Sequence, residues 1–261
     1  MKSSGLLSLT FVLVVFSLCA FAQQVAPPAP PSIPTTGFAG LDQYRASRIA
    51  VFTDDFGQLA RYRSANAELK SPKGVDRVVF FGDSITDSWP LDEYFPGKPY
   101  INRGIGGQTT PQMLVRFRQD VINLRPKVVI ILAGTNDIAG NTGPMRIEDI
   151  EADFASLADL ARANSIKVIY SSILPVHNYT DKSKDFFAQR SSEKIMLLNN
   201  WLRAYCSLPA NGCVFLDYFA AMVDDKGMLK KDLADDGLHP NAAGFKIMAP
   251  MAESAIEKAL K

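Results

Sequence analysis

The amino-acid sequence predicts an α/β protein, a three-layer αβα sandwich around a five-stranded parallel sheet. Five short runs rich in Val and Ile are apolar at nearly every position, which is typical of strands that are covered on both faces. Turn-forming residues and an amphipathic stretch follow these runs. Alternating strands and helices with short connections imply right-handed crossovers, which place helices on both faces of one sheet.

The composition indicates one sizeable globular domain. Of the 261 residues, 47% are hydrophobic and 21% are charged, which is ordinary for a globular chain. We expect this domain to span residues 41–261, after a signal peptide over residues 1–22 and a Pro-rich linker over residues 23–40. Five prolines between Pro27 and Pro34 favour an extended linker over a packed element.

The N-terminus has the features of an export signal. Lys2 precedes an apolar run from Leu6 to Phe21, and small residues around Ala22 provide a cleavage site. A membrane anchor is the alternative, but the run is shorter than the roughly 20 apolar residues that span a bilayer. Cys19 leaves a lipid anchor as a minor alternative. We therefore expect a periplasmic or extracellular protein with no stable membrane insertion after cleavage near Ala22.

The charge balance gives no indication of a polyanionic partner. Without residues 1–22 the chain has 27 basic and 27 acidic side chains, so its formal net charge is zero. Such a chain has no overall electrostatic attraction for nucleic acid or for an anionic membrane.

The elements follow in order along the domain. Residues 41–69 are helical in character. The sequence predicts strands at Arg77–Phe81, Pro99–Asn102, Val128–Ala133, Lys167–Ile173 and Val214–Asp217. It predicts helices between and after them at Thr110–Leu124, Arg146–Asn164, Gln189–Tyr205 and Ala242–Leu260. In such a sheet, ligands bind beyond the carboxyl ends of the strands.

Two cysteines remain in the expected mature chain. Cys206 and Cys213 are seven positions apart, around a stretch of turn-forming residues. In an oxidising compartment we expect them to form a disulfide. Two unpaired buried thiols are the alternative, because spacing alone does not determine geometry.

A candidate nucleophile follows the first predicted strand. Ser84 stands in the segment Gly82-Asp83-Ser84-Ile85, where a glycine lets the backbone turn sharply. A serine hydroxyl reacts only when a nearby base takes its proton. By itself the segment is also an ordinary turn, so the interpretation depends on finding that base.

The sequence contains only two histidines, His177 and His239. His239 directly precedes the last predicted helix, and Asp236 lies three residues before it, within reach of its Nδ1. We expect Asp236 to orient His239 and His239 to take the proton of Ser84. His177 follows the fourth strand, and a plain loop histidine is favoured there over a residue at the rim of a pocket.

Two further loops offer donors for a negatively charged oxygen. Gly104, Gly106 and Gly107 follow the second strand and can expose backbone N–H groups, and Asn136 follows the third strand with a side-chain amide. Each loop is common by itself. Their shared position after strand ends, together with Ser84 and the His239 loop, predicts one pocket.

These four blocks, in this order, resemble the SGNH (GDSL-like) hydrolase family over nearly the whole domain, from Gly82 to Pro240. The resemblance implies a flavodoxin-like fold with Ser84 as nucleophile and Asp236 and His239 as its triad partners. It also implies an oxyanion hole made by the backbone N–H of Ser84 together with Gly107 and Asn136. The first block has Ile85 where the family has Leu. Among the three glycines of the second block, the resemblance leaves Gly107 as the best choice for the oxyanion hole.

Within the family, the segments from Gly104 to Thr110 and from Ile173 to Pro175 are most similar to compact esterases such as the catalytic subunits of platelet-activating-factor acetylhydrolase. This similarity implies hydrolysis of short acyl esters, acetyl esters above all, on a small molecule or a glycan. Lysophospholipase, thioesterase or acyltransferase activity and a non-catalytic carbohydrate-binding domain are the alternatives. No nucleotide fingerprint or metal cluster is recognisable, so no cofactor and no metal are expected.

Overall fold

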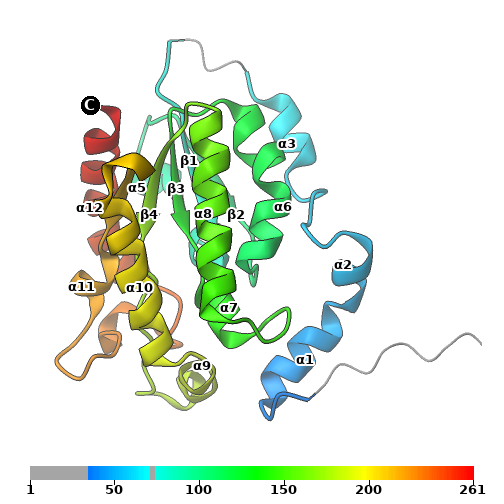
Figure 1. The fold of residues 1–261 in the computed structure, drawn as a ribbon. Coiled ribbons are helices and arrows are strands. Elements are labelled where there is room, and N and C mark those ends of the chain that lie inside the picture. The colour runs from blue at the N-terminus through cyan, green and yellow to red at the C-terminus, as the bar shows by residue number, and fades with distance from the viewer. Residues whose placement is uncertain (1–34, 71–73) are drawn as a thin grey trace, which may run out of the picture. The chain divides into compact units, whose positions relative to one another are not determined.

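The computed structural model describes residues 35–70 and 74–261 and consists of a five-stranded sheet with helices on both faces (Figure 1). All strand pairs are parallel, in the order β2-β1-β3-β4-β5, which confirms the predicted fold class. The strands are β1 (Val78–Gly82), β2 (Tyr100–Gly104), β3 (Val128–Leu132), β4 (Lys167–Ser171) and β5 (Cys213–Leu216). The predicted signal peptide and residues 23–34 of the predicted linker lie outside the described residues.

The helices alternate with the strands as the sequence predicts. Three lie before β1: α1 (Ala39–Ser47), α2 (Ile49–Asp54) and α3 (Arg63–Glu68). Those between and after the strands are α4 (Ser84–Asp87), α5 (Leu91–Tyr94), α6 (Thr110–Asp120), α7 (Thr135–Ala139), α8 (Ile147–Ala163), α9 (Lys184–Gln189), α10 (Ser192–Ser207), α11 (Tyr218–Met222) and α12 (Ala242–Leu260). Helix α1 begins at Ala39, within the last residues of the predicted linker.

Each face of the sheet has its own hydrophobic core, because successive strand side chains point to opposite faces. On one face Val79, Phe81 and Ile131 pack against α6, α8 and α10. On the other face Phe80 and Ile130 pack against α5, α11 and α12. All residues of β1 and β3 are buried, as the apolar runs predict.

Most predicted boundaries differ from the observed ones by one to three residues. The predicted helix Gln189–Tyr205 is wrong at its start, because Gln189 is the last residue of a separate helix, α9. The chain leaves the helical conformation at Arg190, and the side chain of Ser191 accepts the N–H of Lys194 to start α10. The predicted helix Thr110–Leu124 likewise ends as α6 at Asp120 and continues as a short 3₁₀ turn.

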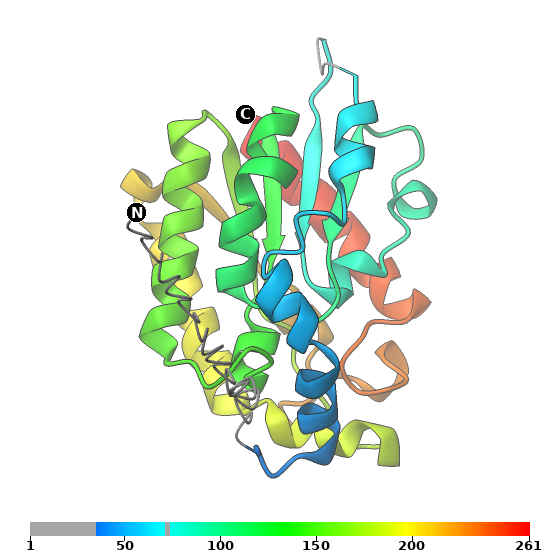
Figure 2. The same cartoon turned by 90° about the vertical axis from the view of Figure 1, so that its right-hand side faces the viewer.

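The carboxyl ends of the central strands lie side by side. Gly82 at the end of β1 pairs with Gly104 of β2 and with Leu132 of β3. The loops that follow these strands therefore leave the sheet at neighbouring points. Figure 2 shows helices α1 and α2 (blue) and α9 (yellow-green) at this same end.

The two cysteines of the domain connect α10 to β5. The sulfur atoms of Cys206 and Cys213 are bonded in the structure, with Cα atoms 5.0 Å apart. This separation lies within the range of protein disulfides. Whether the pair is oxidised in solution stays a prediction. Within residues 35–70 and 74–261, no helix has the length and apolarity to span a membrane.

Candidate active site

Ser84 stands at the first position of α4, directly beyond the carboxyl end of β1. Asp83 caps this short helix, because its Oδ1 accepts the N–H of Ile85 at 2.9 Å. The turn requires a glycine at position 82, since a Cβ there would lie 2.5 Å from the carbonyl oxygen of Leu132. The hydroxyl of Ser84 is thereby held at the edge of the sheet, half-buried.

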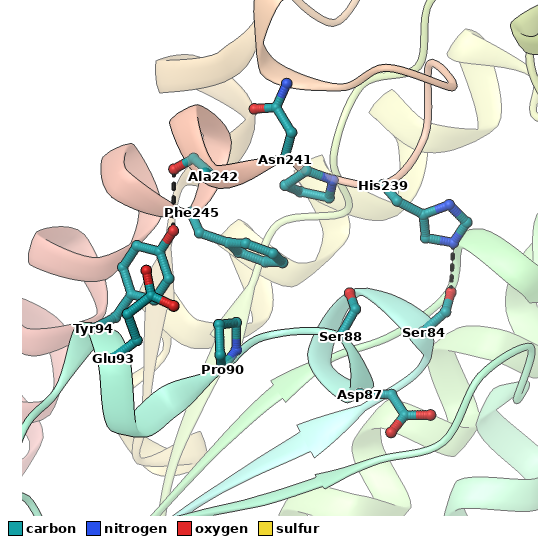
Figure 3. A pocket seen from close by; sticks show the side chains of 11 residues that line it. Ser84, Asp87, Ser88, Pro90, Glu93, Tyr94, His239, Asn241, Ala242 and Phe245 are labelled. Atoms are coloured by element: carbon teal, nitrogen blue, oxygen red, sulfur yellow. Dashed lines mark hydrogen bonds between the residues drawn. The ribbon is translucent and has the colours of Figure 1, made fainter.

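The imidazole of His239 lies between Ser84 and Asp236. Its Nε2 is 2.8 Å from the Oγ of Ser84, and its Nδ1 is 2.6 Å from Oδ2 of Asp236. Figure 3 shows the Ser84 and His239 side chains pointing toward each other. The three residues that the sequence predicts to act together are therefore in hydrogen-bonding contact, although 155 positions separate Ser84 from His239.

Local backbone contacts keep Asp236 in its charged form. Its Oδ1 accepts the N–H groups of Leu238 at 3.0 Å and His239 at 2.9 Å. Burial alone would raise the pKa of Asp236, but the hydrogen bonds from His239 and Leu238 outweigh burial and lower it well below its usual range. Asp236 is therefore a carboxylate at neutral pH and stabilises a proton on Nδ1.

His177 supports the loop that carries Asp236 and His239. It is completely buried, its backbone N–H donates to the carbonyl of Gly237 at 3.0 Å, and its Nε2 lies 2.9 Å from the carbonyl oxygen of Ala234. Gly237 has a φ of +84°, and a Cβ there would lie 2.6 Å from the carbonyl oxygen of His177. His177 is thus a loop histidine, as the sequence favours, and it is buried inside the protein instead of lying at the rim of a pocket.

The three glycines after β2 differ in what their backbone N–H groups contact. The N–H of Gly104 donates to Oδ1 of Asn102 at 2.8 Å, and that of Gly106 donates to Oδ2 of Asp87 at 3.1 Å. No acceptor within residues 35–70 and 74–261 takes the N–H of Gly107. Gly107 has a φ of +78°, a conformation that favours glycine.

Two side chains hold the carbonyl group of Gly107, which belongs to the peptide bond with Gln108. Its carbonyl oxygen accepts the hydroxyl of Tyr44 at 3.3 Å and Nδ2 of Asn141 at 2.9 Å. Tyr44 belongs to α1, which is far from this loop in the sequence. The position of the Gly107 carbonyl group therefore depends on a helix outside the four blocks.

Asn136 lies in the first turn of α7 and is buried. Its Nδ2 donates to the carbonyl of Gln108 at 3.1 Å, and its Oδ1 accepts Nη2 of Arg190 at 3.1 Å. One hydrogen of the Asn136 amide remains for another acceptor.

One recess brings these groups together. It has a volume of about 500 Å³, and Ser84, Gly107, Asn136 and His239 all line it. Its walls are formed largely by α1 and α9, through residues such as Leu41, Tyr44, Arg48, Phe186, Gln189 and Arg190. The residues that the sequence predicts as nucleophile, base and oxyanion donors therefore line one recess.

A second recess opens on the other side of Ser84. It has a volume of about 630 Å³ and is bounded by Pro90, Tyr94 and Phe245 (Figure 3). Ser84 and His239 line both recesses. Tyr94 is held by a hydrogen bond from its hydroxyl to the carbonyl of Ala242 at 3.2 Å. A substrate at Ser84 therefore has space for one group on each side.

Sequence patterns did not identify the walls of the two recesses. Tyr94 is one of several aromatic residues near the first block, and nothing distinguishes it from Trp89 and Phe95, which are core residues. Tyr44 and Phe186 lie on short helices with no motif around them. Phe186 contacts the imidazole of His239 edge-on, with ring centres 6.0 Å apart.

Asp137, beside Asn136, is a buried carboxyl that is only partly satisfied. Its Oδ1 accepts the N–H and the hydroxyl of Thr110 at 2.8 and 2.6 Å, and its Oδ2 has no partner among the described residues. Burial raises the pKa of Asp137 to about 7, although the bonds from Thr110 oppose the change. The folded protein therefore takes up a proton here more readily than the unfolded chain, whose aspartates have a pKa of about 4.

The pKa of Asp137 predicts a pH-dependent change in stability. Since the folded state holds this proton more tightly, the free energy of unfolding falls as pH rises from about 4 to about 7. Asp137→Asn removes the charge, so we expect the variant to have a higher Tm than wild type at pH 8. The corresponding increase in the free energy of unfolding is at most about 4 kcal/mol, and we expect little difference in Tm at pH 4. Thermal unfolding at both pH values measures this, with the exposed Asp92→Asn as control. A variant less stable than wild type at pH 8 would contradict the expectation.

No described residues form a metal site. Within residues 35–70 and 74–261, no group of three or more His, Cys, Asp or Glu side chains is arranged to hold a metal ion.

The α/β sandwich and the serine site define a hydrolase class, and comparisons with known proteins identify the family. The model of the GDSL-like lipase/acylhydrolase family matches residues 80–247. The chain belongs to this family, as the resemblance implies, and is an ester hydrolase. The structure of a GDSL-like lipase from Bacteroides thetaiotaomicron is 41% identical, with a TM-score of 0.72 over 78% of this chain and 100% of that one.

Two curated relatives are more distant. The human platelet-activating factor acetylhydrolase IB subunit alpha2 is 28% identical over 187 residues, which are 67% of this chain and 74% of that protein. The uncharacterized lipoprotein YqeF of Bacillus subtilis is 30% identical over 137 residues, which are 45% of this chain. That match spans 56% of the lipoprotein.

Proposed function

We propose that this protein hydrolyses short-chain acyl esters, most readily acetyl esters, through a covalent acyl-enzyme on Ser84. The observation that carries the proposal is the continuous hydrogen-bonded series from Asp236 through His239 to Ser84, with distances of 2.6 and 2.8 Å. A hydroxyl in contact with an imidazole that a carboxylate orients is the arrangement that activates serine.

In the first half of the reaction, Ser84 becomes acylated. Its Oγ attacks the carbonyl carbon while Nε2 of His239 takes the hydroxyl proton. The imidazolium is stabilised by the carboxylate of Asp236. The C–O bond to the alcohol then breaks, and His239 returns the proton to the leaving oxygen. The acyl group remains on Ser84 as an ester.

In the second half, water releases the acid. His239, again neutral, takes a proton from water as the water oxygen attacks the acyl carbon. Breaking the bond to Oγ regenerates the Ser84 hydroxyl with the proton from His239. One ester and one water thus yield one alcohol and one acid.

Three donors would stabilise the oxyanion in both halves. They are the backbone N–H groups of Ser84 and Gly107 and the remaining amide hydrogen of Asn136. Gly107 is favoured over Gly104 and Gly106 because the N–H groups of the latter two already donate to Asn102 and Asp87. Such donors act strongly because they are held in place before the charge develops.

The shape and polarity of the site favour a short acyl group. The recess that contains Gly107 and Asn136 is bounded by Asn141, Gln189 and Arg190 as well as by apolar side chains. A long acyl chain would need a continuous apolar channel. The likeness to an acetylhydrolase at 28% identity agrees with a small acyl group. An acetylated glycan or another small acetylated alcohol is therefore the substrate class we propose.

We also propose that the mature protein works outside the cytoplasm. The proposal rests on the apolar run from Leu6 to Phe21 followed by Ala22. The likeness of this chain to a lipoprotein agrees with export.

The first test is hydrolysis of p-nitrophenyl esters from acetate to palmitate. We expect kcat/KM to be greatest for acetate and butyrate and to fall by at least about tenfold at longer chains, because Asn141, Gln189 and Arg190 interrupt the apolar lining of the recess. Treatment with a fluorophosphonate should add one label, on the peptide that contains Ser84, as measured by mass spectrometry. Repeating the acetate reaction with excess alcohol measures any acyl transfer.

Each other outcome favours a different function. A preference for palmitate would replace the short-chain esterase by a lipase, and new ester as the main product would replace hydrolysis by acyl transfer. A folded protein that cleaves no ester and takes no label would leave a non-catalytic carbohydrate-binding domain as the better interpretation.

A further inference from the structure

The amide of Asn136 must present nitrogen, not oxygen, to the oxyanion, and its surroundings explain how that orientation is kept. Rotation of an asparagine side chain by 180° exchanges its oxygen and nitrogen with little change in shape. In the rotated form an acceptor would face the developing negative charge. The proposed oxyanion hole therefore needs a group that discriminates between the two orientations.

Arg190 is such a group. Its Nη2 donates to Oδ1 of Asn136 at 3.1 Å, and its Nε donates to the hydroxyl oxygen of Thr135 at 3.0 Å. A guanidinium has five N–H donors and no acceptor, so only the oxygen of the amide can face it. The carbonyl of Gln108 makes the matching selection on the other side, since it can accept only from Nδ2.

Burial makes the guanidinium a rigid partner. Arg190 is 3% exposed, and it follows the last residue of α9. Its guanidinium lies over the ring of Phe186, 5.3 Å from the ring centre. Arg190 makes no ion pair within residues 35–70 and 74–261. Burial lowers the pKa of Arg190 to about 10, and the charges of Asp83 and Asp236 oppose this change, so the guanidinium stays charged at neutral pH. The bond to Asn136 is thus a charge-assisted bond inside the protein, where such bonds are strong.

We infer that Arg190 is a positioning residue, which fixes the Asn136 amide with its N–H toward the oxyanion and polarises that N–H. This inference rests on the proposed function, because it assigns a role within the same oxyanion hole. It adds a residue from outside the four blocks, on the segment between β4 and α10.

The test is a double-mutant cycle between Arg190 and Asn136, measured on p-nitrophenyl acetate. We expect Arg190→Met to lower kcat by about 10- to 100-fold with little change in KM, because an oxyanion donor acts in the transition state. In an Asn136→Ala background the same change should lower kcat by less than about threefold, since the group that Arg190 orients is then absent. Arg190→Lys should recover part of the activity, because an ammonium is also a pure donor.

Arg45 of α1 provides a matched control, because it contacts the other end of α7. It is 6% exposed and donates to the carbonyl of Gly140, without contact to Asn136. We expect the effect of Arg45→Met on kcat to be the same in the wild-type and Asn136→Ala backgrounds. Circular dichroism and Tm verify that each variant is folded. Should Arg190→Met not fold, Arg190→Lys replaces it in the cycle, with a smaller but still background-dependent effect.

The outcomes separate this inference from the proposed function. If Asn136→Ala lowers kcat but Arg190→Met has the same effect in both backgrounds, the positioning role is wrong and the oxyanion hole stands. An increase in KM at constant kcat would likewise overturn it, because Arg190 would then bind substrate directly. If Asn136→Ala leaves kcat unchanged, the proposed oxyanion hole itself fails.

Discussion

Replacing Ser84 with alanine is expected to lower kcat on p-nitrophenyl acetate by a factor on the order of 10⁵ or more, with a folded protein and little change in KM. The variant has no hydroxyl to form the acyl-enzyme, so water must attack directly. Ser84 is half-buried at the start of α4, and its Oγ contacts only His239 among the described residues. Its loss should therefore change Tm by only a few degrees. Stopped-flow and steady-state kinetics on purified protein measure the rate.

Ser88 provides the matched control for Ser84. It directly follows the same short helix as its C-cap and lines the second recess, and its hydroxyl donates to the carbonyl oxygen of Ile85 at 3.4 Å. Ser88→Ala removes the same atoms without touching His239, so we expect a rate within a few-fold of wild type. Hydrolysis by Ser84→Ala within tenfold of wild type would rule out Ser84 as the nucleophile.

Asp236→Asn is expected to lower kcat by about 10⁴-fold, as replacement of the corresponding carboxylate does in other serine hydrolases. An asparagine retains Oδ1, which accepts the N–H groups of Leu238 and His239, so the loop should keep its shape. In the position of Oδ2, however, it would place an NH₂ group against Nδ1 of His239. Nδ1 must then accept, Nε2 carries the hydrogen, and His239 can no longer take the proton of Ser84.

Asp235 is the control for the charge of Asp236. It is exposed, one residue away, and its Oδ1 accepts Nδ2 of Asn241 at 3.1 Å. Asp235→Asn removes the same charge from the loop without touching the imidazole, so we expect less than about threefold loss of rate, on the scale of a screened surface charge. Equal losses from both variants would indicate that the charge of the loop matters and the orientation of His239 does not.

The arrangement of the sheet follows from local features of the sequence. The runs around Val78, Val128 and Val168 are apolar on both alternating faces, and only a strand covered on both sides buries such a run. Parallel strands then need helical crossovers, which the amphipathic stretches supply. The helix Ala242–Leu260 has the predicted bounds because Asn241 caps its start. The helix predicted from Gln189 is wrong there, because the chain leaves the helical conformation at Arg190 and Ser191 caps the start of α10.

The candidate site is partly determined by the sequence for a related reason. In a parallel sheet the carboxyl ends of the strands lie at one edge, so Ser84, Gly107 and Asn136 come together once the strands are known. The position of Asp236 three residues before His239 is also local information. These relations depend on the parallel direction of the strands and on short turns, both of which leave a signature in the residues.

Only the tertiary structure decided the rest. The N–H groups of Gly104 and Gly106 are occupied by particular side chains, whereas Gly107 has a positive φ and no such contact within the described part of the chain. Arg190 meets Asn136 across 54 positions, and Tyr44 meets Gly107 across 63. Contacts of this kind join short helices and loops that lie far apart in the sequence, so no local periodicity predicts them. The sequence by itself determined the fold and the positions of the residues proposed to react, whereas the walls of the site and the groups that orient its proposed donors required packing between distant segments.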